Sequence, residues 1–341
     1  MKKILMLAFS LALFVMVAPV SASEKRLTIY APRVTDAEKA LYAQFQEKTG
    51  IAVHVVEGQP GDLIKRIGEE GTEAQADLFV SVDGGILHQA KKSGILQPIP
   101  ENAIADIPKT LRDKENHWTA LAYRARVIVY SQDRVNTKDL STYEDLADPK
   151  WKGRVVVRSG SALYNQSLLA SLIALDGEEK TAAFVKGLVE NFASPSQGGD
   201  RPQVKKIADG LADVALVNTY YIGMMLNSSK PEEVDAAKKV AVFFPNQKGS
   251  GTHINVNGIG LVKNAQNKEN AVKLIEFLAS APAQEQRCAM TFEFPANAKV
   301  KKTALMEGWG AFKAQVIDFA VLAENKEIAT QIVKDNNWNE D

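Results

Sequence analysis

Residues 26–56 read RLTIYAPRVTDAEKALYAQFQEKTGIAVHVV, and this stretch decides the fold class. Residues 26–30 predict a strand, and residues 36–49 predict a helix with apolar side chains at helical spacing that stops at Gly50. Residues 51–56 predict a second strand. A helix beginning at Asp62 and a strand at residues 76–81 follow. This strand–helix alternation is typical of an α/β protein with mainly parallel sheets.

The same alternation continues along the chain after a long β-rich run at residues 120–130. Residues 154–157 and 213–217 predict strands, and residues 164–175 predict a helix between them. Residues 240–244 and 254–262 predict strands that return to the first set, and residues 270–278 predict a later helix. Since no linker rich in proline or serine separates the two sets, they are expected to form two lobes joined by crossing strands.

The order of the predicted strands and helices indicates where the lobes begin and end. The expected division is a first lobe from residues 23–122 and 252–300, a second lobe from residues 123–251, and C-terminal helices at residues 301–341 that pack on the second lobe.

The N-terminus predicts an exported protein. Lys2 and Lys3 precede an apolar run at residues 4–17, and Val20-Ser21-Ala22 suits signal peptidase, so residues 1–22 are expected to be cleaved after Ala22. The apolar run is too short for stable membrane insertion, and no cysteine lies nearby to carry a lipid. A periplasmic location is therefore expected.

Composition excludes some partners and sites. The chain has 41 basic and 41 acidic residues, and the signal peptide removes only two lysines, so charge gives no case for nucleic acid or an anionic membrane. Cys288 is the one cysteine, so no internal disulfide forms, and it is expected to be a core residue. The four histidines do not cluster in the sequence, which disfavours zinc and copper sites.

The first candidate site is Asn218-Thr219-Tyr220-Tyr221, directly after the strand predicted at residues 213–217. Within a strand, adjacent tyrosines would point to opposite faces. Asn218 suits a helix N-cap, so both phenols are expected in a first helical turn, where they can lean toward one cleft. Ligands of open α/β sheets sit at the carboxyl ends of strands, where this motif lies. The alternative is that both tyrosines are packing residues.

A second candidate segment runs from Arg158 to Gln166. Ser159, Gly160 and Ser161 can offer hydroxyls and a close backbone approach to an anion, and Tyr164 adds a third phenol. Hard cations prefer oxygen donors such as phenolate. Ordinary helix capping remains the alternative for residues 159–161.

Together these segments and the signal peptide resemble the periplasmic ferric-ion-binding proteins of bacterial ABC importers, which are transferrin-like solute-binding proteins. Further matching segments are Ile29-Tyr30-Ala31-Pro32-Arg33, Ala76-Asp77-Leu78-Phe79, Tyr123-Arg124-Ala125-Arg126-Val127, residues 161–167, Gly251-Thr252-His253-Ile254-Asn255 and Phe292-Glu293-Phe294-Pro295. The resemblance implies a two-lobed periplasmic binding protein of type 2, with hinge strands crossing between the lobes.

The resemblance also implies a site. Tyr164, Tyr220 and Tyr221 would bind Fe³⁺, and a synergistic anion, carbonate, would complete the shell. Arg33, Arg124, Asn218 and residues Ser159, Gly160 and Ser161 would hold that anion. The protein would be a monomer that delivers iron to an inner-membrane ABC permease.

One departure from the family concerns the first lobe. Many relatives follow the arginine of the first strand with histidine, or with histidine and tyrosine, as metal ligands, whereas Val34 and Thr35 follow Arg33. The site therefore resembles the three-tyrosine variety. Asp62 lies near the place where some relatives carry a ligating glutamate, although helix capping is the alternative role.

Three other classes of function stay open. Arg33, Arg124 and the turn at residues 159–161 could bind an oxyanion or a small organic solute, which would not need three tyrosines. A secreted hydrolase is disfavoured because the chain has no G-x-S-x-G, H-E-x-x-H, P-loop or dinucleotide motif. A structural envelope protein is disfavoured because the chain has no repeats. A binding protein without catalysis is the prediction.

Overall fold

The computed structural model describes residues 25–339, so the predicted signal peptide lies outside the described residues. Within this part of the chain, no helix is long and apolar enough to cross a membrane. The strands are β1 (Arg26–Ala31), β2 (Ala52–Glu57), β3 (Leu78–Ser81), β4 (Leu96–Gln97), β5 (Trp118–Ser131), β6 (Val155–Val156), β7 (Val214–Asn218), β8 (Val240–Phe243), β9 (Ile254–Val262) and β10 (Phe294–Pro295).

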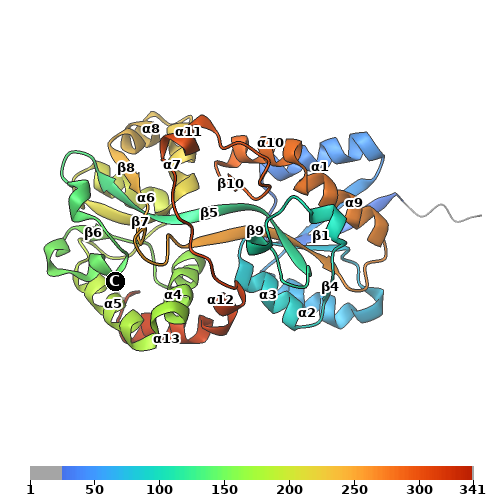
Figure 1. Ribbon diagram of the computed structural model, residues 1–341, viewed down its shortest axis with the longest axis horizontal. Coiled ribbons are helices and arrows are strands. Elements are labelled where there is room, and N and C mark those ends of the chain that lie inside the picture. The colour runs from blue at the N-terminus through green and yellow to red at the C-terminus, as the bar shows by residue number, and fades with distance from the viewer. Residues whose placement is uncertain (1–24, 340–341) are drawn as a thin grey trace, which may run out of the picture.

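Helices surround these strands in two groups (Figure 1). They are α1 (Asp36–Thr49), α2 (Pro60–Glu70), α3 (Gly84–Lys92), α4 (Leu163–Asp176), α5 (Glu178–Glu190), α6 (Asp200–Ala208), α7 (Thr219–Leu226), α8 (Pro231–Lys238), α9 (Lys268–Ala279), α10 (Ala281–Thr291), α11 (Ala304–Gly308), α12 (Ala320–Glu324) and α13 (Lys326–Asp335).

The first lobe confirms the predicted α/β class, but the expectation of mainly parallel sheets is wrong, because β5 and β9 pair antiparallel with all of their neighbours. β1 pairs in parallel with both β2 and β3, as consecutive strand–helix units require. Thr35 begins α1 with a capping box in which its side chain and that of Glu38 each accept a backbone hydrogen bond. Gly50 ends the helix at a positive φ of 68°, which glycine adopts without steric cost.

Two long strands join the lobes. The first part of β5 pairs with β9, and its second part pairs with β7 and β8. The register pairs Ala125 with Ile254 and Arg126 with Asn218, so β5 leaves one half of the sheet and enters the other at these residues. The predicted crossing strands are therefore present as β5 and β9, in the centre of Figure 1.

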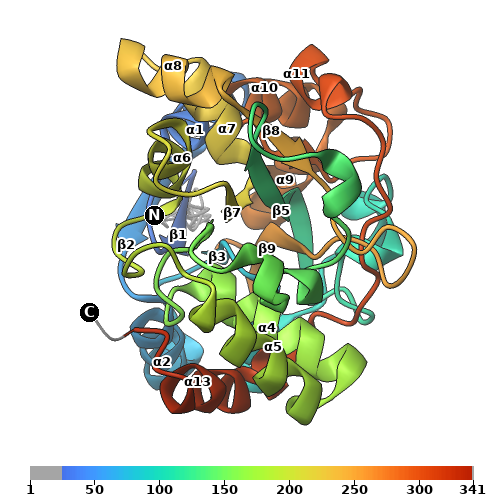
Figure 2. The same cartoon turned by 90° about the vertical axis from the view of Figure 1, so that its left-hand side faces the viewer.

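The second lobe brings the candidate segments to one edge. β6 and β7 are parallel, so their carboxyl ends lie at the same edge of the sheet. α4 begins shortly after β6, and α7 begins directly after β7. Figure 2 looks onto this lobe, with α4 and α5 below β7 and α7 and α8 above it.

The C-terminal segment runs back across the molecule. α13 packs on α4 and α5, and α12 packs against both α3 and α4, between which it lies in Figure 1. Gly84 and Gly85, at the start of α3, allow this approach: an added Cβ would lie 2.5 Å from the Phe319 ring and 2.9 Å from Leu322, respectively.

Candidate metal centre

Three tyrosines meet at the start of two helices. Tyr164 lies in the first turn of α4, and Tyr220 and Tyr221 lie in the first turn of α7. The Tyr220 hydroxyl donates to that of Tyr164 at 3.0 Å, and the rings of Tyr220 and Tyr221 are 4.3 Å apart at their centroids. The structure thus brings together three phenols from segments 56 residues apart.

The tyrosine cluster disfavours ionisation while no cation is present. Burial, followed by the neighbouring phenols of Tyr164 and Tyr221, raises the pKa of Tyr220 well above 10. Burial and the charges of Tyr164 and Asp200 also raise the pKa of Tyr221. Tyr220 and Tyr221 are therefore neutral at pH 7, and a bound cation is needed to convert them to phenolates.

Two guanidinium groups lie beside the cluster. The guanidinium carbons of Arg124 and Arg158 are 5.4 and 5.2 Å from the centroid of the Tyr164 ring. Burial disfavours the charge of Arg158, but Asp200 and Tyr221 outweigh this effect and raise its pKa. The sequence analysis assigned no role to Arg158. Arg158 directly follows the strand predicted at residues 154–157 and precedes Ser159, and this position could have indicated a site residue.

Several buried N–H groups near the tyrosines have no acceptor. Arg124 donates through Nη1 to the Val256 carbonyl at 2.8 Å, while its Nη2 is unpartnered. Nδ2 of Asn218 and Nε of Arg126 and Arg158 are also unpartnered. Arg124, Arg126 and Asn218 line one small hollow together with Tyr164. Because an unpaired buried donor is costly, these groups favour an added acceptor, and the hollow of about 10 Å³ has room for about one water.

A buried carboxylate organises these donors. Asp200, at the start of α6, accepts from Arg126 Nη1 at 2.6 Å and from the Asn218 backbone N–H at 2.9 Å. It also lies 3.5 Å from Arg158 Nη1. Asp200 is fully buried, so it fixes the cations and the start of α7 relative to one another. Asp200 was not predicted from the sequence as a site residue.

Residues 159–161 face the C-terminal segment. The Ser159 hydroxyl is 2.6 Å from Asn339 Oδ1 and 2.7 Å from the Ser161 hydroxyl. A Cβ on Gly160 would lie 2.7 Å from the Trp338 ring. None of the three lines the cleft beside the tyrosines.

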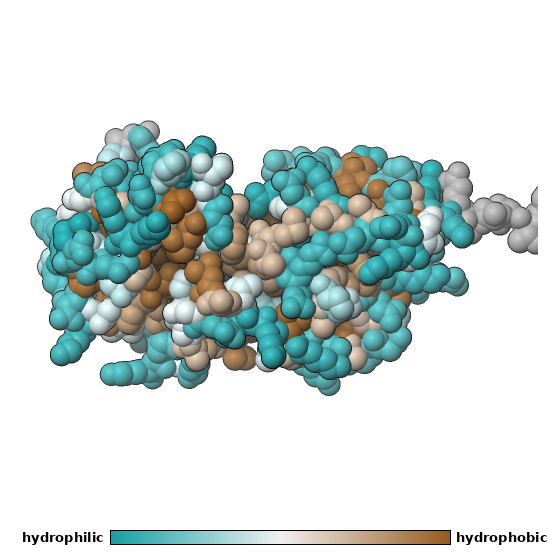
Figure 3. Space-filling model, turned by 90° about the horizontal axis from the view of Figure 1, so that it is seen from above, coloured by the Kyte–Doolittle hydropathy of each residue, from teal (hydrophilic) through white to brown (hydrophobic). Residues whose placement is uncertain are grey.

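That cleft is a cavity of about 700 Å³ between the lobes, and Figure 3 shows the molecule from above, indented between them. Tyr164, Tyr220 and Arg124 line one side, and Arg33, Val34 and Thr35 line the other, together with Glu38, Asn257, Arg287 and Glu293. Arg33 is exposed. Arg33 of the first lobe therefore lines the same cleft as Tyr164 and Tyr220, whereas Tyr221 does not line it.

Asp62 does not line the cleft. It is exposed in the first turn of α2, which begins at Pro60. The N-cap of α2 is Gln59, and no side-chain hydrogen bond caps the helix. The capping role considered for Asp62 is therefore not observed.

Another acidic group lies far from the tyrosines in the sequence. Asp113, Glu115 and His117 place their ligand atoms within 4.8 Å of one another. The ammonium group of Lys91 lies 2.8 Å from Asp113 and 2.9 Å from Glu115. The ammonium group of Lys91 therefore already balances the charge of these carboxylates, and this acidic group is not a candidate metal site.

The comparisons place the chain among iron-related binding proteins. Iron uptake protein A1 of Synechocystis sp. is 42% identical over 323 residues, which cover 94% of this chain and 90% of that protein. The solved Trichodesmium protein IdiA (FutA), in complex with iron and citrate, is 43% identical with a TM-score of 0.86, covering 92% of this chain and 99% of that one. The ferric binding protein of Campylobacter jejuni is 38% identical with a TM-score of 0.84, covering 91% and 99%.

These relatives confirm the resemblance drawn from the sequence and the predicted two-lobed fold. Residues 73–324 match the family model described as bacterial extracellular solute-binding protein. This chain therefore belongs to the bacterial extracellular solute-binding proteins, which are transport proteins and not enzymes.

Proposed function

We propose that this protein binds ferric iron together with an anion in the periplasm and delivers it to an ABC permease. The observation that carries the proposal is the meeting of Tyr164, Tyr220 and Tyr221, with the Tyr220 and Tyr164 hydroxyls 3.0 Å apart. Three phenolates balance the charge of one ferric ion, and hard oxygen donors suit such a cation. The names of the relatives, which describe iron uptake and ferric binding, support the same cargo.

The anion is the second part of the proposal. Arg124 Nη2 and Asn218 Nδ2 are buried donors without acceptors beside Tyr164, and Arg33 stands on the other lobe. A planar oxyanion such as carbonate matches the fork of donors on a guanidinium. Ser159, Gly160 and Ser161 could join only after the hydroxyl contacts with Asn339 rearrange.

Delivery completes the proposed function. The predicted signal peptide supports a periplasmic location, and membership of the solute-binding family supports a permease partner. The protein is proposed to act as a monomer, because one chain supplies all three tyrosines and the arginines.

A second candidate cargo is an oxyanion or small organic solute. The unpartnered arginine donors favour it, and a putative 2-aminoethylphosphonate-binding protein of Salmonella typhi is 25% identical over 330 residues. The tyrosine trio argues against it, because an oxyanion alone would not need three clustered phenols in addition to the arginine donors.

A visible-absorbance titration separates these candidates. Metal-free mature protein is titrated with ferric nitrilotriacetate, with and without bicarbonate. A phenolate-to-iron charge-transfer band that is weakened in Tyr220→Phe supports the ferric site, and its dependence on bicarbonate supports the anion. No band at stoichiometric iron would reject iron as the cargo and leave the oxyanion or organic solute.

A further inference from the structure

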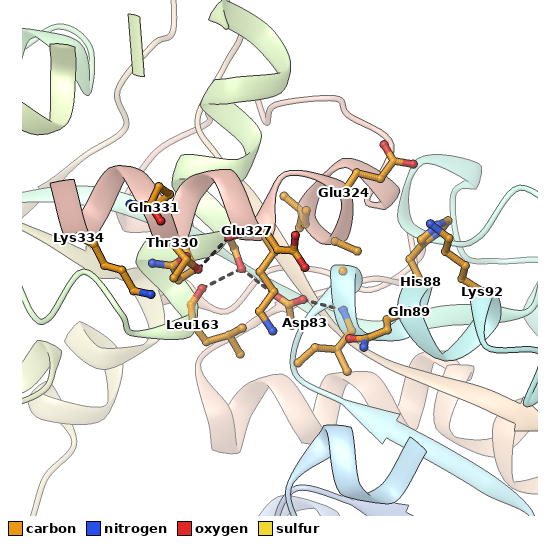
Figure 4. Close-up of a pocket in the computed structure, with 17 residues that line it drawn as sticks. Asp83, His88, Gln89, Lys92, Leu163, Glu324, Glu327, Thr330, Gln331 and Lys334 are labelled. Carbon is orange, nitrogen blue, oxygen red and sulfur yellow. Dashed lines mark hydrogen bonds between the residues drawn. The ribbon is translucent and has the colours of Figure 1, made fainter. Parts of the chain in front are cut away.

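The first turn of α4 separates two spaces between the lobes. Tyr164 lines the cleft of about 700 Å³. Leu163, Gln166 and Ser167 line a second cavity of about 660 Å³, which α3, α12 and α13 also border (Figure 4). With open space on two sides, the position of this turn depends on a small set of hydrogen bonds.

Most of these bonds hold the turn to the second lobe and to α13. Asn165 Oδ1 accepts from Arg126 Nη2 at 2.8 Å, and Gln166 Nε2 donates to the Gly160 carbonyl at 2.7 Å. Gln166 Oε1 also accepts from the Thr330 hydroxyl of α13 at 2.9 Å. These contacts fix Tyr164 relative to its own lobe.

One further bond reaches the first lobe. Ser167 Oγ lies 2.6 Å from Asp83 Oδ2 and 2.9 Å from the Leu163 carbonyl oxygen. The hydroxyl has one hydrogen, and the negative charge and shorter distance assign it to Asp83. Figure 4 shows this contact between α4 and the start of α3. Ser167 follows Tyr164 by three residues, so both lie on neighbouring positions of one helical turn.

Asp83 is itself held firmly in the first lobe. Its Oδ1 accepts from the Ile86 backbone N–H at 2.9 Å and caps α3, and its Oδ2 accepts from Asn255 Nδ2 at 2.7 Å. Asn255 belongs to the crossing strand β9, and its Oδ1 accepts from the Gly84 backbone N–H. Asp83 and Ser167 line the second cavity but are only 3% and 4% exposed, so their bond is largely shielded from water.

We propose that Asp83 is a positioning residue for Tyr164. Through Ser167 it ties the turn that carries this phenol to the first lobe and to the crossing strand, so lobe movement and metal-site geometry are coupled. This proposal rests on the ferric function proposed above. The Asp83–Ser167 bond also lets the first lobe influence the position of Tyr164, even though Val34 and Thr35, which follow Arg33, supply no metal ligand.

The test compares two serines of the same helix. Ser167→Ala removes the bond to Asp83. Ser171→Ala is the matched control, because Ser171 is also buried on α4 but donates to its own helix, at the Leu168 carbonyl. Ser167→Thr keeps the hydroxyl and serves as the rescue. Asp83→Asn removes the negative charge. Its amide N–H₂ would also face the groups of Ser167, Asn255 and Ile86 that donate to Asp83, so one of these hydrogen bonds would be lost.

Release of iron into excess chelator is followed through the charge-transfer band of the loaded, mature protein. Ser167→Ala and Asp83→Asn are expected to release iron about tenfold faster or more, the size expected for a buried bond to a charged group. Ser171→Ala and Ser167→Thr are expected to match the wild type. The proposal would be overturned if Ser167→Ala released iron at the wild-type rate, or if Ser171→Ala accelerated release as much as Ser167→Ala does.

A second measurement does not depend on iron. Amide hydrogen exchange in the metal-free protein is expected to accelerate in the first turn of α4 in Ser167→Ala and not in Ser171→Ala. If the wild type shows no band, the ferric function fails, while exchange still reports on the tie between the lobes. Unchanged exchange in Ser167→Ala would reject the tie itself.

Discussion

Binding of ferric iron is expected to release protons from the tyrosine cluster, and Tyr220 and Tyr221 account for at least two of them. The pKa values of Tyr220 and Tyr221 are raised by burial and by their neighbours, so both phenols are protonated in the empty cleft at pH 7. A metal needs the phenolate, so each loses one proton on binding. Each released proton makes the affinity change about tenfold per pH unit. These two tyrosines together predict a loss of at least about a hundredfold for each unit that the pH falls.

Isothermal titration in two buffers of different ionisation enthalpy measures the proton number directly. Ferric nitrilotriacetate is the donor at a fixed pH, and the slope of apparent enthalpy against buffer enthalpy gives the protons released. Tyr220→Phe is the reference, because both proteins liberate the same chelator, whose own proton uptake cancels in the difference. The wild type should release about one proton more than the variant. An equal proton number in the two proteins would refute the assignment of Tyr220 as a phenolate ligand that is neutral when empty.

Three further predictions concern the surroundings of the site. Arg124→Gln should lower ferric affinity about tenfold or more and reduce its dependence on bicarbonate in the absorbance titration, because one charged anion donor is lost. His253 is buried and its pKa is lowered to about 4, so its contribution to stability is present above pH 6.5 and is lost as the pH falls toward 4. Between pH 6.5 and 4, the free energy of unfolding measured with urea should therefore fall by about 3 kcal/mol less in His253→Gln than in the wild type. An equal fall in the two proteins would contradict this prediction. Gly223→Val should destabilise the protein by about 2 kcal/mol or more, since an added Cβ would lie 2.5 Å from Phe292, whereas Gly68→Ala, with its nearest contact at 3.9 Å, should not.

The sequence predicted the fold well because its signals are local. The apolar spacing of residues 36–49 and the glycine at 50 lie within the helix that they define, and α1 has these bounds. The start of α2 was wrong by two residues. Pro60 begins the helix because proline fits the first helical position, where its missing N–H is not needed.

The site was partly predictable for the same reason. The tyrosine pair directly follows β7, so its placement in the first turn of α7 follows from sequence alone. The role of Asp200 was not predictable in this way, and neither was the packing of Gly160 on Trp338. Both depend on partners far along the chain. Asp200 is 74 residues from Arg126, and Ser159 is 180 residues from Asn339. No local pattern marks such pairs, because only the tertiary fold brings them together.

The charges around the cleft give a reason for iron and anion to bind together. When the cleft is empty, Tyr220 and Tyr221 are neutral, and Asp200 accepts from Arg126 at 2.6 Å. In the proposed complex, one ferric ion and three phenolates carry no net charge. Arg124 and Arg158 would then remain as cations beside a neutral complex in a buried site, with N–H groups that have no acceptor. An anion that contacts both the metal and these donors removes this cost, whereas iron alone does not. We therefore expect tight retention of iron to require the anion, because Asp200 contacts Arg126 and Arg158 but not Arg124, whose Nη2 has no acceptor.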